Sequence, residues 1–212
     1  TGMTYDGKFQ NNSDNTGSGF GYLLSLRYGL TETFDVRAAM AIRRDKITNQ
    51  GIEESFGGLN LINLGFRWNV IDGKGKGPAL AFQQDFRLNT GTSEVYRLSN
   101  LAPRTLMFFG MPLTPWLSLV TNLGMTWDGE SPKPKGYYTL NLSFPVVDKL
   151  GGFVEVYGVT GDNIFGVNFD TGVGYLVNND LQLDLSVGFV SLTEYAGAYF
   201  VDGGVSWRIK HK

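Results

Sequence analysis

The stretch Asp180-Leu181-Gln182-Leu183-Asp184-Leu185-Ser186-Val187-Gly188-Phe189 alternates polar and apolar side chains from end to end. Leucine, valine and phenylalanine hold the odd-numbered positions, and polar residues or glycine hold the even-numbered ones. In an extended strand, alternate side chains point to opposite faces, so this period of two gives one apolar and one polar face. The stretch therefore predicts a β-strand with only one face in an apolar environment.

The same period of two recurs along the whole chain, and no helical period competes with it. In Phe34–Arg43, for example, Val36 and Met40 alternate with Asp35 and Arg37. The predicted strands are Met3–Phe9, Gly19–Gly29, Phe34–Arg43, Ile62–Val70, Ala79–Leu88, Arg104–Met111, Leu117–Trp127, Tyr137–Phe144, Gly152–Val159, Val167–Tyr175, Asp180–Val190 and Tyr199–Ile209. The sequence predicts an all-β fold of about twelve antiparallel strands in a single domain, residues 1–212.

The connections between these strands alternate in length. The short ones are Leu30–Thr33, Ile71–Gly77, Pro112–Pro115, Val147–Gly151 and Val177–Asn179. The longer, polar ones are Gln10–Gly17, Asp45–Gly57, Asn89–Pro103, Asp128–Gly136, Gly161–Gly166 and Ser191–Ala196. This alternation is typical of a transmembrane antiparallel β-barrel of the Gram-negative outer membrane, with short periplasmic turns and longer extracellular loops.

Aromatic residues supply a second indication of a membrane barrel. Six lie close to a short turn or to the C-terminus, where a barrel strand crosses the lipid–water interface: Tyr28, Phe34, Trp68, Trp116, Tyr175 and Trp207. Trp127 is expected at the opposite rim. The alternative, a soluble sandwich or ligand-binding barrel, would turn the apolar faces inward, although twelve strands enclose more volume than side chains fill.

One uncharged run, Thr105–Trp127, is long enough to cross a bilayer as a helix. Pro112 and Pro115 stand in its middle, and each would break a helix, so two strands joined by a turn are the favoured interpretation.

Composition and charge exclude several classes of function. The chain has 18 Lys and Arg against 20 Asp and Glu, a net charge of −2, which disfavours nucleic-acid binding. It has no cysteine and one histidine, His211, which lies beyond the last predicted strand. Without a histidine inside the barrel, no Ser-His-carboxylate arrangement can be built. We therefore predict a non-enzyme with no catalytic, cofactor-binding or metal site and no cofactor.

Three short motifs could suggest other chemistry, and each has a simpler interpretation. Asp128-Gly129-Glu130 offers oxygen ligands for Ca²⁺ but lacks the ligand number of a dedicated loop, so a solvated turn is favoured. The glycine-rich run Gly73–Gly77 lacks the helix of a phosphate-binding loop. Gly172-Val173-Gly174 lies inside a strand, where glycine marks close packing or a bend.

If the apolar faces meet lipid, the polar faces line a lumen. The predicted lumen-lining residues are Arg27, Arg37, Arg43, Arg67, Asp85, Arg87, Glu155, Asp170, Asp184, Asp202 and Arg208. Positive charge concentrates on the early strands and negative charge on the late ones. Opposed walls could set a transverse field across a narrow pore. Alternatively, arginines and carboxylates could pair and fill the interior. We favour pairing, which predicts a restricted conduit, although the two are compatible.

A family resemblance rests mainly on the C-terminal half. Its motifs are Asn122-Leu123-Gly124, Trp127-Asp128-Gly129-Glu130-Ser131-Pro132, Asp148-Lys149-Leu150-Gly151, Phe153-Val154-Glu155-Val156-Tyr157-Gly158, Asn179-Asp180-Leu181-Gln182-Leu183-Asp184 and Tyr199-Phe200-Val201-Asp202-Gly203-Gly204-Val205-Ser206-Trp207-Arg208. In this order and spacing, the chain resembles the outer-membrane transporters related to the phenol meta-pathway degradation proteins, especially those of Bacteroidota. The resemblance covers Leu117–Arg208 well and the first half loosely, through Leu26–Leu30 and Leu64–Arg67. It implies a barrel in the bacterial outer membrane that passes small or aromatic compounds.

The chain departs from that family pattern in three places. Family members usually end in an aromatic residue, whereas Ile209 is followed here by Lys210-His211-Lys212. The usual stretch before the first strand is missing, and any signal peptide is expected to have been removed. Arg104–Met111 reads as apolar on both faces, so one face could meet a plug or a partner.

The sequence thus predicts a passive outer-membrane conduit for small solutes, surrounded by lipid and lipopolysaccharide. A closed barrel that serves as an accessory subunit of a larger complex is the alternative, with Met107–Leu119 as the candidate interface.

Overall fold

The computed structural model describes residues 2–10, 15–74, 77–161, 164–190 and 198–209, with backbone only for 2–10, 15 and 164. Its elements are β1 (Gly2–Gln10), β2 (Asn15–Gly29), β3 (Phe34–Asn49), β4 (Ile52–Ile71), β5 (Ala79–Arg87), the 3₁₀ turn η1 (Glu94–Tyr96), β6 (Ala102–Thr114), β7 (Leu117–Thr126), β8 (Lys135–Val147), β9 (Leu150–Gly161), β10 (Ile164–Phe165), β11 (Asn168–Asn178), β12 (Leu181–Val190) and β13 (Ala198–Trp207).

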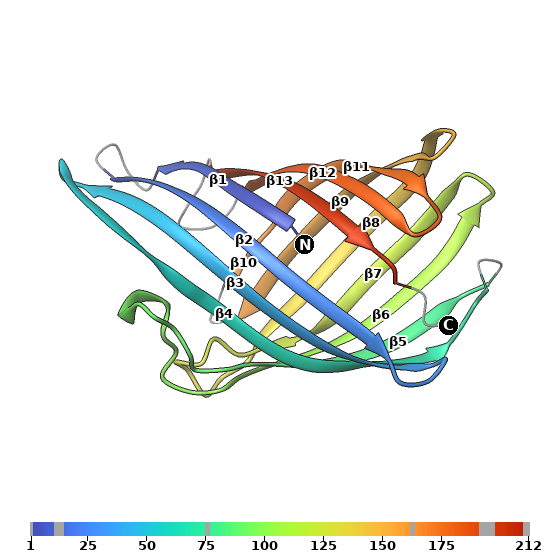
Figure 1. Cartoon of the computed structure of the whole chain (residues 1–212), viewed down its shortest axis with the longest axis horizontal. Helices are drawn as coiled ribbons and strands as arrows, with labels where there is room; N and C mark the ends of the chain where they lie inside the picture. Colours follow the sequence, from blue (N-terminus) through green and yellow to red (C-terminus); the bar gives the residue numbers. More distant parts are fainter. Residues whose placement is uncertain (1, 11–14, 75–76, 162–163, 191–197, 210–212) are drawn as a thin grey trace.

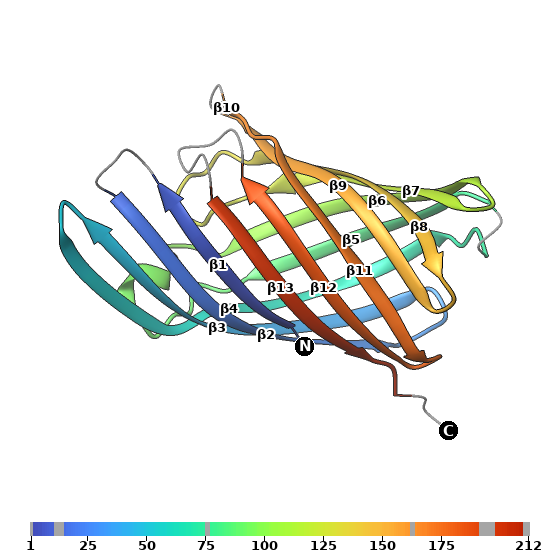
Figure 2. The same ribbon diagram turned by 90° about the horizontal axis from the view of Figure 1, so that it is seen from above.

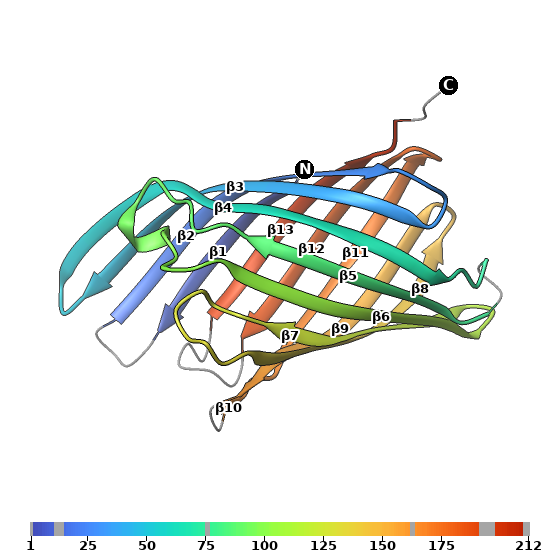
Figure 3. The same cartoon turned by 90° about the horizontal axis from the view of Figure 1, so that it is seen from below.

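All described strands belong to one antiparallel sheet, which curls around an interior (Figure 1). Each long strand pairs with the next long strand along the chain, β9 pairing with β11. The first and last strands, β1 and β13, also pair, so the pairings run in a ring. The two-residue β10 pairs only with the end of β9. Figures 2 and 3 show the strands tilted around the barrel axis. The predicted all-β antiparallel class is confirmed.

Three predicted connections differ from the structure. The segment Asp45–Gly57 is not a loop, because β3 and β4 continue through it to a two-residue turn at Gln50 and Gly51. Both turn residues have positive φ, 50° and 81°, which fits a tight hairpin turn. The polar side chains at the ends of these two strands read like a loop in the sequence. The predicted turn Pro112–Pro115 is shorter, because β6 runs to Thr114 with an irregular register after Pro112. A third predicted loop, Gly161–Gly166, contains β10.

The uncharged run Thr105–Trp127 forms the paired strands β6 and β7. In the described part of the chain, no helix is long and apolar enough to cross a membrane. Arg104–Met111 carries apolar side chains on both faces, and the prediction that one of them meets a plug or a partner stays a prediction. Leu106 is only 2% exposed and Met107 is 53% exposed, so the two faces of β6 have different surroundings.

The large apolar side chains point away from the barrel interior. Leu26, Ile42, Leu123 and Leu185 are 61%, 51%, 59% and 56% exposed. By contrast, the buried apolar residues among the described side chains are few: Ala81, Tyr96, Ala102, Leu106 and Ala198. A soluble β-sandwich or ligand-binding barrel would bury the large apolar side chains in its core. This outward arrangement contradicts that alternative and matches a barrel whose outer face meets lipid.

Most of the predicted aromatic band lies on this outer face. Tyr28, Trp68, Trp116, Tyr175 and Trp207 are all exposed and lie near a short turn or the end of β13. Phe34 belongs to the same region, where Phe66 stacks on it at 5.5 Å between ring centroids. Together with Thr33, Trp68 and Phe82, these two rings line a shallow apolar groove. The short-turn end of the barrel therefore carries an aromatic rim.

Candidate functional site in the barrel interior

Contacts that skip a strand identify the inner face of the sheet. The Arg37 Nη1 atom on β3 lies 3.7 Å from Asp85 Oδ1 on β5. The guanidinium carbon of Arg67 on β4 lies 4.5 Å from the ring centre of Phe108 on β6. Side chains two strands apart can meet only on the concave side of a curved sheet. Because side chains alternate between the two faces of a strand, the strand register then assigns each of the other residues to the inner or the outer face.

The register places every predicted lumen-lining residue that lies in a strand on this inner face. Cross-strand partners include Arg27 with Arg37, Asp85 with Arg104, and Glu155 with Asp170. Asp184 pairs with Gly204, and Asp202 with Ser186. Arg208 lies just beyond β13, where its backbone N–H donates to the Asp180 carbonyl over 2.7 Å. The structure brings some of these residues together in two groups, which we call the arginine wall (inner faces of β2–β6) and the carboxylate wall (inner faces of β9 and β11–β13).

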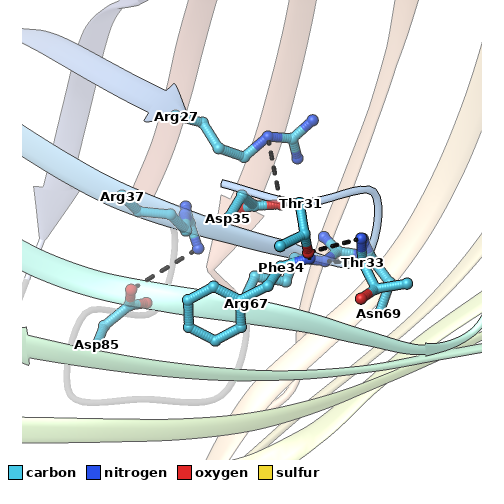
Figure 4. A network of polar contacts seen from close by, with 9 residues as sticks. All are labelled: Arg27, Thr31, Thr33, Phe34, Asp35, Arg37, Arg67, Asn69 and Asp85. Atoms are coloured by element: carbon cyan, nitrogen blue, oxygen red, sulfur yellow. Dashed lines mark hydrogen bonds and ion pairs between the residues drawn. The ribbon is translucent and has the colours of Figure 1, made fainter. Parts of the chain in front are cut away.

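The arginine wall holds an interlinked polar network (Figure 4). Gly65 lies between Arg37 and Asp85 in the register, and without a side chain there the two charges reach each other. Asp85, with its side chain only 5% exposed, also accepts a hydrogen bond of 2.6 Å from Gln83 Nε2. Nearer the short-turn end, Arg27 Nε lies 3.9 Å from the Asp35 carboxylate. The carboxylates therefore offset much of the positive charge of this wall.

The remaining arginines are held by neutral partners. Arg67 Nε donates to the Asn69 side-chain oxygen at 3.2 Å while its guanidinium covers Phe108. Arg87 Nη2 donates to the Asn60 carbonyl at 2.8 Å. Arg104 stacks over the Tyr137 ring at 4.5 Å from the ring centre. Each arginine therefore lies against the wall, held by at least one hydrogen bond or aromatic ring.

Near the long-loop end, a connecting segment packs against the inner face. Arg43 Nε donates to both oxygens of Asp45, at 2.8 and 2.9 Å. The Tyr96 hydroxyl, from η1, donates to Asp45 Oδ2 at 2.7 Å, and its ring packs on Phe56. Burial, together with the bond to the negative Asp45, raises the pKa of Tyr96 above its ordinary value. The network therefore fixes η1 to the projecting β3–β4 hairpin.

The carboxylate wall has a different character. Glu155 and Asp170 are direct cross-strand neighbours, and Glu155 lies within hydrogen-bonding reach of Asn141 and Thr139. Asp184 accepts a hydrogen bond from Gln182. Among the described residues, no Lys or Arg nitrogen lies within 4.0 Å of the Glu155, Asp170 or Asp184 carboxylates. Glu155 and Asp170 repel each other when both are ionised, and no close basic group among the described residues offsets the charge of these two or of Asp184.

Sequence reasoning missed several inner-face residues. Arg104 stood at the start of an apolar run, and only its register with Asp85 shows which face it takes. Tyr137 and Phe108, which the arginines cover, were not selected because aromatic residues occur on both faces. Tyr96 lies in a predicted loop, and its contact with Asp45 spans 51 positions in the sequence, so no local pattern marks it.

The possible Ca²⁺ motif is a hydrogen-bonded turn. The Asp128 Oδ1 atom accepts the backbone N–H groups of Glu130 and Ser131 at 2.9 and 2.8 Å. Ser99 donates its N–H and its hydroxyl to the two Glu130 oxygens, at 2.9 and 2.6 Å. These bonds lower the pKa of both carboxyls. The described residues contain no cluster of three or more metal-ligand side chains. His211 lies outside the described residues.

Comparisons with known proteins agree with this architecture. The sequence model of the family described as "Putative MetA-pathway of phenol degradation" matches residues 2–209, which confirms the resemblance seen in the sequence. No curated protein matches the chain in sequence.

Solved structures share the fold at low sequence identity. An outer membrane channel from Pseudomonas putida F1 aligns with a TM-score of 0.70 at 12% identity, over 97% of this chain and 93% of that one. The KdgM porin in complex with disordered oligogalacturonate gives a TM-score of 0.61 at 12% identity, over 99% and 100%. The NanC porin gives 0.57 at 7% identity, over 98% and 100%. The chain thus has the fold of outer-membrane β-barrel porins and channels.

Proposed function

This chain belongs to the family described as "Putative MetA-pathway of phenol degradation", and we propose that it is a passive outer-membrane conduit for small solutes, aromatic ones included. One observation carries the proposal. The ring of paired strands has an apolar outer face and a polar, charged inner face. The four buried polar residues among the described side chains, Asp35, Gln83, Asp85 and Thr139, all lie on that inner face. A barrel with polar residues inside can offer solutes an aqueous path.

In this proposal, the barrel has twelve membrane-spanning strands, with β10 belonging to a loop. The short turns, such as the one at Asp148 and Lys149, face the periplasm. The projecting β3–β4 hairpin and the segment carrying η1 face the outside. Residues 1–212 act as a single domain in contact with outer-membrane lipid and lipopolysaccharide. The aromatic rim supports this orientation, because Trp and Tyr concentrate at the lipid–water interface.

The inner charges make the conduit narrow rather than open. Arg27, Arg37 and Arg43 pair with carboxylates, and such pairs occupy lumen space. The carboxylate wall opposite adds a transverse field, which orients dipolar solutes and disfavours uncharged apolar ones. The lumen-lining set then comprises the predicted residues, with Arg104 and Tyr137 added from the structure.

Single-channel recording of the folded barrel in a planar bilayer tests this function. Discrete conductance steps support a conduit. Reversing the charge of Arg67 or Arg37 should shift ion selectivity if the pore conducts past these residues. A barrel that is folded, as judged by heat-modifiable gel migration, yet silent would contradict the conduit.

A second candidate function has its own supporting observation. Three of the chain's five methionines, Met107, Met111 and Met125, lie on the outer face of β6 and β7. Register places Met107 opposite Leu123, and Met111 opposite Leu119. Flexible methionine clusters suit adaptable protein contacts. This cluster, within and beside Met107–Leu119, supports a barrel that docks in a larger outer-membrane complex. Crosslinking from Met107→Cys in whole cells, with Leu185→Cys as the control, distinguishes a partner from lipid.

A further inference from the structure

The inner face of the carboxylate wall is built largely from small residues. Register places Gly151 on β9, Gly172 and Gly174 on β11, and Ser186 and Gly188 on β12 on this face. Gly151 and Gly174 are direct partners, and Asp184 follows next to Gly174. Side chains without bulk leave space beside the backbone here.

Two aromatic residues on this wall lie flat on glycines instead of pointing into the lumen. A Cβ atom at Gly172 would come within 2.7 Å of the Phe153 ring, so this ring occupies the position that a side chain would take. In the same way, a Cβ at Gly188 would lie within 2.9 Å of three carbon atoms of the Phe200 ring. The glycines therefore hold both rings against the wall, which keeps this side of the interior thin.

On the arginine wall, the corresponding space is filled by charged side chains. At Gly65, an added Cβ would come within 3.0 Å of the Asp85 Cα atom, and at Gly21 it would meet the Arg43 side chain at 3.8 Å. Long arginine side chains and the Phe108 ring cover the rest of that wall. Among the described side chains, the long charged ones therefore gather on the arginine wall.

A cavity marks the open side. It has a volume of about 570 Å³ and lies at the short-turn end. Its lining combines the inner-face residues Ser118, Ser143, Gly151, Phe153, Gly174 and Asp184 with residues of the short turns and the outer face, among them Trp116, Phe144 and Lys149. The inner-face residues belong to β7–β9, β11 and β12, and none of the lining residues belongs to the arginine wall.

We propose that the solute path is off-centre, following the inner faces of β9, β11 and β12, and that Glu155, Asp170 and Asp184 along it make the conduit favour cations and amine-bearing small solutes. The proposal rests on the proposed conduit function and goes beyond it by naming a path and a class of solute. Arginines outnumber carboxylates on the arginine wall, so that wall by itself would favour anions. The geometry separates the two signs of charge. Arg27, Arg37 and Arg43 pair with carboxylates, and Arg67, Arg87 and Arg104 keep their charge on the arginine wall, whereas among the described residues no Lys or Arg nitrogen lies within 4.0 Å of these three carboxylates.

The expected change in ion selectivity can be worked out from the distance between a carboxylate and a passing ion. A unit charge about 5 Å from a passing ion changes the local ion concentration roughly fourfold, even at the dielectric constant of water. Added salt screens this interaction over about 10 Å at 0.1 M. Removing the adjacent Glu155 and Asp170 charges should therefore reduce cation preference about fourfold or more.

Reversal potentials in a KCl gradient across a planar bilayer test the charge. We expect the unmodified barrel to prefer K⁺ over Cl⁻, and the Glu155→Gln/Asp170→Asn pair to lose most of that preference. Glu54→Gln, at the exposed tip of the β3–β4 hairpin, removes a carboxylate away from the path and should leave selectivity unchanged. A Cl⁻ preference in the unmodified barrel, or an unchanged ratio in the double variant, would overturn the path while leaving the conduit intact.

Steric variants test the path independently. Gly174→Leu should fill the cavity and lower K⁺ conductance at least twofold. Ala39→Leu, on the inner face of β3, adds similar volume to the arginine wall and should lower conductance less. Equal reductions would show a central path. All variants are first checked for heat-modifiable migration, which reports a folded barrel. If no folded barrel conducts ions, the unmodified one included, the conduit function itself is refuted.

Discussion

The ion pair between Arg37 and Asp85 provides a quantitative test of the arginine wall. Its Nη1–Oδ1 distance is 3.7 Å, and the two side chains are 28% and 5% exposed. At an effective dielectric constant of about 20, the direct attraction is about 4 kcal/mol. Desolvation offsets part of this, since charged groups at a mostly buried site lose hydration. We expect a coupling energy of about 1–3 kcal/mol, with Asp85→Asn alone costing about 2 kcal/mol because Arg37 remains partly buried.

A double-mutant cycle measures this coupling. Asp85→Asn, Arg37→Gln and the double variant are unfolded with urea from detergent micelles, and tryptophan fluorescence reports the transition. Lys46 and Glu53, on the projecting hairpin, form the control cycle. Their N–O distance is only 2.7 Å, but their side chains are 52% and 56% exposed. Exposed pairs contribute less than about 1 kcal/mol, so the control coupling should be the smaller one despite the shorter distance. If both couplings come out equally small, the Arg37–Asp85 network contributes nothing measurable and the argument fails.

Three further predictions follow from other contacts. Gly65→Ala should push Asp85 away from Arg37, because a Cβ at position 65 would lie 3.0 Å from the Asp85 Cα atom. The Arg37–Asp85 coupling energy measured in the Gly65→Ala variant should fall below about 0.5 kcal/mol. Tyr96→Phe should release η1 from Asp45 and speed hydrogen exchange in η1. Because folding raises the pKa of Tyr96, the stability that this contact contributes should be fully present below the ordinary tyrosine range and should decrease as the pH rises above it. Because base catalysis alone speeds amide exchange as the pH rises, the protection factor at each pH is compared, and a protection factor unchanged from neutral pH to pH about 11 would contradict this. Brominated lipids should quench Trp68, Trp116 and Trp207 on the outer face, and the absence of quenching at these three would contradict the aromatic rim of the short-turn end.

Alternation was sufficient to predict the fold class, because a barrel in lipid needs an apolar outer face on every strand. It placed Leu183, Leu185 and Phe189 on one face and Asp184 on the other, as the structure has them. The ends of β3 and β4 were not predictable in this way. Lys46 and Glu53 occur where the strands leave the apolar region, and there both faces become polar and the period disappears. Only pairing between the two strands reveals that they continue.

The interior could be predicted only in part, for a physical reason. The alternation of side chains along a strand assigns each residue to the inner or the outer face, and this was enough to select Arg37, Asp85 and Asp170. It does not specify which inner residues meet, because strands two apart are related by curvature and not by sequence spacing. The positions of the glycines on the inner face decide which of these side chains can meet. Gly65 stands between Arg37 and Asp85 and lets them pair, whereas Gly172 and Gly188 let aromatic rings lie flat against the opposite wall. In the proposed conduit, the glycines on the inner face thus determine which charged side chains can pair and where space is left along the proposed path.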